Sequence, residues 1–130
     1  MAYQHNDGGK AGAGFKGNGD CGIRAVAIAL ELPYNDSRKL LKEYAKKGKQ
    51  GNGQISRGIY KEDMDAALRS RDWIWRSAPK FTGRKARYQD IPRGRVIVRM
   101  AKHYAVVIDG VLLDAWNSSE KMVYGYWEKG

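Results

Sequence analysis

Cysteine is nearly absent from this 130-residue chain, and histidine is scarce. The sequence has one cysteine, Cys21, and two histidines, His5 and His103. A single thiol excludes an intramolecular disulfide and any zinc site built from several cysteines, and two histidines give little basis for a structural metal site. We therefore expect no metal or other cofactor, and a reducing, cytoplasmic setting.

Long apolar runs and acidic residues are also lacking. No window approaches the roughly 18 consecutive apolar residues of a membrane span, and the first residues do not read as a secretory signal. Asp and Glu number 14 against 24 Lys and Arg, which leaves a formal net charge of +10. We expect no membrane partner, and the charge favours an acidic protein, nucleic acid or an anionic cell-wall polymer as partner.

The length fits a single domain, residues 1–130, with a sizeable core. Residues 1–19 are rich in glycine and poor in apolar side chains, so we expect an irregular arm there. The segments GAGFKG and GNGDCG satisfy the G-x-G-x-x-G spacing of dinucleotide-binding loops. Neither follows a predicted strand or opens a βαβ unit, so we interpret these glycines as a turn into the following helix.

Three helices are predicted after the arm. The first begins near Cys21 with Asp20 as its N-cap and closes at Leu32-Pro33, the second lies within residues 35–48, and the third is capped by Ser56. Their apolar faces recur at helical spacing: Ile23, Val26, Ala27, Leu30; Leu40, Leu41, Tyr44; Tyr60, Met64, Ala67, Leu68.

Strand-like segments follow, because the apolar period changes from 3.6 to 2. They fall within residues 71–78 and at 95–101, 103–108, 111–116 and 122–127. Helices first and antiparallel strands afterwards predict an α+β fold, with the N-terminal helices packed on a C-terminal antiparallel sheet.

The dipeptide Asp109-Gly110 predicts a two-residue hairpin turn. Residues whose numbers sum to 219 then face each other, so that Ala105 lies opposite Asp114 and His103 opposite Trp116. Asp114 becomes the diagonal neighbour of His103 on one face, at the roughly 7–8 Å spacing that two side chains can close.

The position of Cys21 at a helix start suggests a chemical role. The N–H groups and partial positive charge of a helix N-terminus favour a thiolate over a thiol, and a nearby imidazolium adds to this. We expect Cys21 to act as nucleophile, His103 to transfer the proton and Asp114 to orient the imidazole.

The order of these residues resembles that of the papain-like cysteine peptidases, in which a His opens a hydrophobic strand and the third residue is followed two positions later by a Trp. Here the segments are HYAVVI and DAW, and Trp116 stands at the shielding position. The segment GRVIVRMAKHYAVVIDGVLLDAW also resembles the C39-type peptidases and, with DC on a helix and a VYGYW ending, small papain-fold proteins of phages and bacteria. The resemblance covers residues 17–32 and 92–127 and implies a papain-like fold, a protein or peptide substrate, and the host cytoplasm if the chain is phage-encoded.

Papain-type enzymes place an oxyanion-binding Gln several residues before the Cys, where this chain has Phe15. Asn18 is the nearest amide that could take that role, and Gln4 and Asn6 are weaker candidates. The backbone N–H of Cys21 would contribute a second donor.

Two other functions stay open at this point. A papain-fold protein without turnover could bind an acidic protein or nucleic acid through its basic clusters, within residues 38–49 and 84–102. A cell-wall amidase could use the same three residues, although no export signal or wall-binding repeat supports it.

Overall fold

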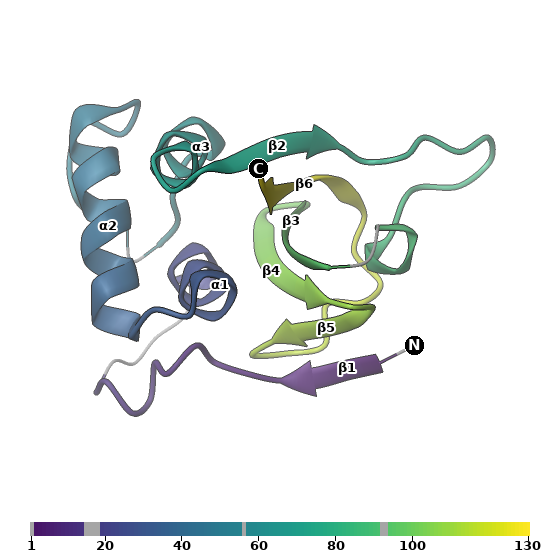
Figure 1. The fold of residues 1–130 in the computed structure, drawn as a ribbon, viewed down its shortest axis with the longest axis horizontal. Helices are drawn as coiled ribbons and strands as arrows, with labels where there is room; N and C mark the ends of the chain where they lie inside the picture. The colour runs from purple at the N-terminus through teal and green to yellow at the C-terminus, as the bar shows by residue number, and fades with distance from the viewer. Residues whose placement is uncertain (1, 15–18, 56, 92–93) are drawn as a thin grey trace.

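In the computed structural model, which describes residues 2–14, 19–55, 57–91 and 94–130, helices gather on one side of a six-stranded sheet (Figure 1). The described residues thus form an α+β fold, as the sequence predicts. The elements in chain order are β1 (Ala2–His5), α1 (Cys21–Leu30), α2 (Tyr34–Lys47), α3 (Lys61–Arg69), β2 (Trp73–Ser77), the 3₁₀ helix η1 (Tyr88–Asp90), β3 (Arg95–Met100), β4 (His103–Ile108), β5 (Val111–Asp114) and β6 (Val123–Lys129).

The sheet is mixed, which corrects the prediction of an antiparallel sheet. Its strand order is β1-β5-β4-β3-β6-β2, and β1 runs parallel to β5 while every other neighbouring pair is antiparallel. The extra strand comes from residues 2–5, for which the sequence predicts an irregular arm. Its pairing joins segments more than 100 residues apart, and a local pattern does not reveal such a partner.

Helix α1 is buried on nearly all sides, since seven of its ten residues are buried, from Gly22 to Ala29. It packs against β4 and β3 on one side and against α2 on the other. A helix that is apolar around most of its circumference belongs in an interior, and the mostly small or aliphatic sequence CGIRAVAIAL suits that place. Cys21 is therefore the first residue of a central helix.

The predicted start of the first helix is confirmed, and that of the third needs correction. Asp20 occupies the N-cap position of α1, but its side chain makes no capping hydrogen bond. The third helix begins at Lys61, with Tyr60 at its N-cap position, and the proposed cap Ser56 lies outside the described residues. Tyr60 is exposed instead of joining the apolar face of that helix.

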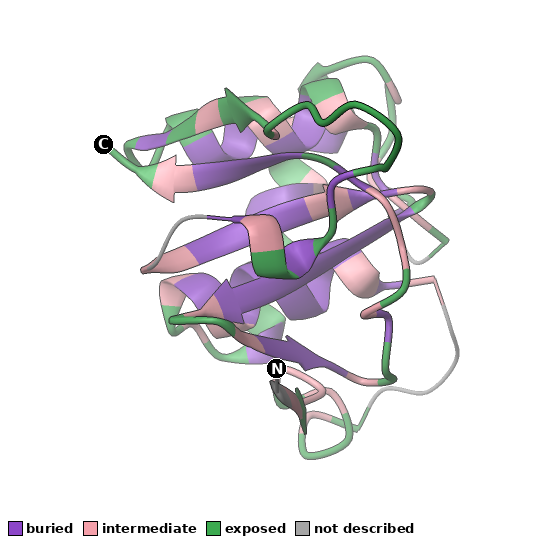
Figure 2. Ribbon diagram, turned by 90° about the vertical axis from the view of Figure 1, so that its right-hand side faces the viewer, coloured by how far each residue is buried: buried purple, intermediate pink, exposed green. Residues whose placement is uncertain are grey.

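Both faces of the sheet are covered. On the helix side, Ile97, Val106 and Trp127 pack with side chains of α1, α2 and α3. On the other side, Val98 and Val107 belong to a second apolar cluster that includes residues of the segment 78–91, which lies over that face. Figure 2 shows the resulting burial of the central strands along almost their whole length. Among the described residues, no helix combines the length and apolarity needed to cross a bilayer.

The predicted hairpin register is confirmed next to the turn, but the strand predicted over 111–116 ends at Asp114, so His103 and Trp116 are not a strand pair. β4 pairs with β5 through Val106 and Leu113, Val107 and Leu112, and Ile108 and Val111, all of which sum to 219. Asp109 and Gly110 have φ values of 48° and 86°, and positive φ at both central positions is the condition for the type I′ turn that suits a two-residue hairpin.

Candidate active site

Three element ends meet at one place. Cys21 is the first residue of α1, His103 the first residue of β4 and Asp114 the last residue of β5. His103 also directly follows the tight turn that joins β3 to β4, where Met100 pairs with it. The three side chains that the sequence proposes as nucleophile, base and orienting acid thus come together at one end of the central hairpin.

His103 and Asp114 form a buried, charge-assisted hydrogen bond. His103 Nε2 lies 2.6 Å from Asp114 Oδ2, and the two side chains are 6 % and 2 % exposed. The hydroxyl of Ser118, which is also buried, donates to the same carboxylate oxygen at 2.6 Å. A hydrogen bond between the Cys21 and His103 side chains contributes to the pKa shifts of both residues.

The pKa values of Cys21 and His103 move in opposite directions. Burial raises the pKa of the Cys21 thiol, but the hydrogen bond and charge of His103, the backbone N–H of Tyr104 and the charge of Arg24 together bring it below its usual value. Burial lowers the pKa of His103, but the hydrogen bonds to Asp114 and Cys21 outweigh it and raise that pKa to about 9. Both shifts favour a thiolate beside an imidazolium at neutral pH.

Hydrogen bonds fix both the carboxylate and the backbone of Asp114. Its Oδ1 accepts a hydrogen bond from the backbone N–H of Ala115 at 2.7 Å. Its backbone oxygen accepts from the Tyr3 hydroxyl at 3.1 Å and from the N–H of Asn6 at 2.8 Å. The strand β1, which sequence reasoning missed, therefore clamps the backbone beside the acid of the site.

Asp20, the residue before the cysteine, is buried and bound by three side chains. Lys10 Nζ lies 2.9 Å from its Oδ1, the Arg24 guanidinium pairs with the same oxygen, and the Tyr34 hydroxyl donates to Oδ2. Burial raises the pKa of Asp20, but its hydrogen bonds to Tyr34 and Lys10 and the charge of Arg24 outweigh it, so that this pKa lies below its usual value. The carboxylate is thus held by side chains and does not cap the helix.

Arg24 connects this carboxylate to the site. Its Nη2 lies 3.8 Å from Asp114 Oδ1, while Nη1 holds Asp20, so one guanidinium lies between the two acids. Its Nε is buried and has no hydrogen-bond partner among the described residues. The i, i+4 spacing of Asp20 and Arg24 on a helix was a visible signal for this pair, but nothing local to it indicated Asp114.

The described side chains that pair with one another here carry equal numbers of positive and negative charges if Cys21 is a thiolate and His103 an imidazolium. Three negative and three positive side chains take part: Asp20, Cys21, Asp114; Lys10, Arg24, His103. A carboxylate next to a cysteine ordinarily opposes thiolate formation. Here Lys10 and Arg24 pair with the Asp20 carboxylate, so its negative charge opposes thiolate formation at Cys21 less strongly.

Trp116, which the sequence proposes as the shielding residue, has its ring close to the imidazole and tilted by 43° to it. The centroids of the Trp116 and His103 rings are 4.8 Å apart, and the indole is 46 % exposed. The proposed oxyanion residue Asn18, like Phe15, lies outside the described residues. Of the weaker candidates, Gln4 is exposed on β1, and Asn6 Oδ1 accepts the N–H of Gly8 at 2.8 Å.

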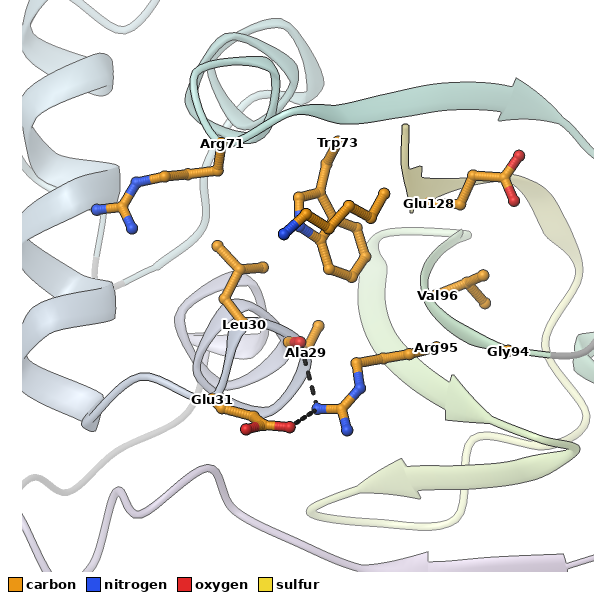
Figure 3. A pocket seen from close by; sticks show the side chains of 10 residues that line it. Ala29, Leu30, Glu31, Arg71, Trp73, Gly94, Arg95, Val96 and Glu128 are labelled. Carbon is orange, nitrogen blue, oxygen red and sulfur yellow. Dashed lines mark hydrogen bonds and ion pairs between the residues drawn. The ribbon is translucent and has the colours of Figure 1, made fainter.

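A separate hollow of about 630 Å³ lies at the other end of α1 (Figure 3). Its charged residues include Arg95 and Glu31, which form an ion pair at 2.8 Å, and the buried Trp73 contributes to its wall. The ten residues of α1 rise about 15 Å, which separates this hollow from Cys21. Within the described ranges, no group of three or more His, Cys, Asp or Glu side chains is arranged to hold a metal ion.

Comparison with known proteins finds no family model, no curated protein and no solved structure that matches this chain.

Proposed function

We propose that this chain is a papain-like cysteine hydrolase, a peptidase or isopeptidase that works in the cytoplasm through an acyl-enzyme on Cys21. The observation that carries the proposal is the position of His103, whose ring is hydrogen-bonded to Asp114 at 2.6 Å and is near enough to Cys21 to lower the pKa of the thiol. The helix start that bears Cys21, buried against the strand that bears His103, supports the papain-like reading of the fold.

Acylation begins with the ion pair. The Cys21 thiolate attacks the carbonyl carbon of an amide, and the carbonyl oxygen becomes an oxyanion. The His103 imidazolium gives its proton to the amide nitrogen as the C–N bond breaks, so the amine leaves neutral and a thioester stays on the sulfur. Asp114 keeps the ring oriented and stabilises its positive charge before this transfer.

Deacylation reverses the proton path. Neutral His103 accepts a proton from water while the water oxygen attacks the thioester carbonyl, and collapse of the second oxyanion releases a carboxylic acid and restores the thiolate. The oxyanion would be bound by the backbone N–H of Cys21 and by the amide of Asn18. The Asp20 side chain makes no capping bond to the first turn, so it does not compete for that N–H.

Intact-mass spectrometry tests this proposal directly. The protein is mixed with unfolded polypeptides and with isopeptide-linked peptides, quenched in acid, and examined for an acyl adduct on Cys21 and for cleaved products. We expect both for the wild type, no adduct for Cys21→Ala and at least about a 100-fold lower turnover for His103→Ala, the usual contribution of general acid–base catalysis. Asp36→Asn, on the exposed surface of α2, serves as control and keeps full turnover.

A second function, binding without turnover, is favoured by the formal charge of +10. Under that alternative the wild type forms no adduct with any of these substrates, while salt-sensitive binding to an acidic partner survives Cys21→Ala. That pair of results would contradict the hydrolase.

A further inference from the structure

Residues 78–86, which follow β2, extend beyond the sheet as a short hairpin of their own (Figure 1). Phe81 and Arg84 form an isolated antiparallel bridge, and Gly83 between them has φ of 84°, a value that glycine adopts without strain. The Arg84 guanidinium carbon lies 3.8 Å from the centroid of the Phe81 ring, and Asp90 binds the guanidinium through two oxygens at 2.8 and 3.0 Å. The tip is therefore held in shape by its own contacts.

A hollow of about 400 Å³ lies between this hairpin and the start of β6. Phe81 lines it from one side and Tyr124 from the other, and these aromatic side chains are 40 % and 43 % exposed. They are two of the five large apolar side chains that stand out as exposed among the described residues. Their presence around one hollow of ligand size points to a partner with flat, stackable groups.

The charge around the hollow has one sign. Lys80, Arg84 and Lys85 line it, and none of its lining residues is acidic. Neither lysine has an ion-pair partner within the described part of the chain, so their charges are available to a ligand. These positive charges would increase the affinity for a polyanion with regularly spaced negative charges.

We propose that this hollow binds single-stranded nucleic acid, with bases stacked on Phe81 and Tyr124 and phosphates beside Lys80 and Lys85. Unpaired bases offer the flat faces that exposed rings bind, and their backbone supplies the negative charges. An acidic peptide would satisfy the lysines but would leave the rings unused. The site is independent of the thiol chemistry, because none of its lining residues belongs to the candidate active site.

Fluorescence anisotropy with a labelled oligothymidylate of about 12 nucleotides, within the site size of single-strand binders, measures the affinity of the full chain. Phe81→Leu and Tyr124→Ala should each weaken binding by about 5- to 150-fold, the loss that corresponds to about 1–3 kcal/mol per stacked base. Tyr124→Phe keeps the ring and should bind like the wild type, which separates stacking from a loss of folding.

Two variants elsewhere on the molecule serve as matched controls. Tyr60→Ala removes a ring that is 50 % exposed and has Lys49 beside it, and Lys46→Ala removes a charge from α2; both should leave the affinity within about twofold, because neither lines the hollow. Lys80→Ala and Lys85→Ala should each reduce the slope of log affinity against log salt by about 0.7. Cys21→Ala should bind unchanged.

Three results would overturn the proposal. The oligonucleotide could fail to bind at low salt, Phe81→Leu and Tyr124→Ala could retain the wild-type affinity, or Tyr60→Ala could lose as much as they do. Equal binding of polyglutamate, with no effect of the ring variants, would assign the surface to acidic proteins instead. None of these results bears on turnover at Cys21, so the hydrolase is judged separately.

Discussion

Replacing Arg24 by methionine tests whether this guanidinium stabilises the two buried carboxylates beside the candidate active site, Asp20 and Asp114. Methionine fills a similar volume without charge, so the change leaves Asp20 with fewer partners and Asp114 without its nearby guanidinium. The side chains of Arg24 and Asp20 are only 8 % and 6 % exposed, so solvent does not screen their interaction appreciably. Removing one partner of such a buried pair typically costs about 3–5 kcal/mol.

The expected loss converts to a large change in melting temperature. An unfolding entropy of about 2.1 cal/mol/K per residue over 130 residues makes each kcal/mol equal to about 3.7 °C. We therefore expect Arg24→Met to lower the Tm by about 11–18 °C in calorimetry. The double variant Asp20→Asn with Arg24→Met should recover part of that loss, because no carboxylate is then left beside a missing cation.

The control is the pair of Arg69 and Asp65 on α3, which has the same i, i+4 spacing but an Arg side chain that is 72 % exposed. Arg69→Met should change stability by less than about 0.5 kcal/mol. Equal Tm values for Arg24→Met and Arg69→Met, or a double variant no more stable than Arg24→Met alone, would refute the reasoning.

Two further predictions concern the imidazole and the sheet. Because folding raises the pKa of His103 from 6.5 to about 9, its charge stabilises the fold below pH 6.5, and this contribution is lost as the pH rises through about 9. An NMR titration should place the midpoint of His103 near 9, and Asp114→Asn should lower that midpoint. A wild-type midpoint near 6.5 would contradict the prediction. Gly125→Ala should destabilise the protein by about 1–3 kcal/mol in urea unfolding, because its Cβ would overlap the ring of Trp75 in the neighbouring strand. Gly12→Ala, whose Cβ would meet no atom closer than 3.7 Å, should be nearly neutral, and equal losses would refute the packing argument.

The hairpin of β4 and β5 could be predicted because its signals are local. Asp109 and Gly110 determine the turn, the turn determines the register, and the register places His103 near Asp114. The position of Cys21 at the start of α1 followed in the same way from helical spacing. The place of each of these three residues in its helix or strand could therefore be predicted without information from distant parts of the chain.

The features that the sequence did not reveal depend on distant partners. Residues 2–5 form a strand because they pair with the edge of β5. The glycine-rich residues that follow them made the whole segment look irregular. Asp20 does occupy the N-cap position, but its side chain binds Lys10 and Tyr34 in other segments, so the prediction that this side chain caps the helix was wrong. The apolar cluster under residues 78–91 could not be predicted either, because apolar residues in that segment recur at neither a helical nor a strand period.

Alkylation of Cys21 by iodoacetamide as a function of pH tests the thiolate–imidazolium pair most directly, because the chain has no other cysteine. The wild type should react with a midpoint below the value of about 8.5 for an unperturbed thiol, since His103 lowers the pKa of Cys21. His103→Ala should move that midpoint above about 8.5, because burial then acts without the opposing imidazolium. Superimposable profiles for the two proteins would contradict the account.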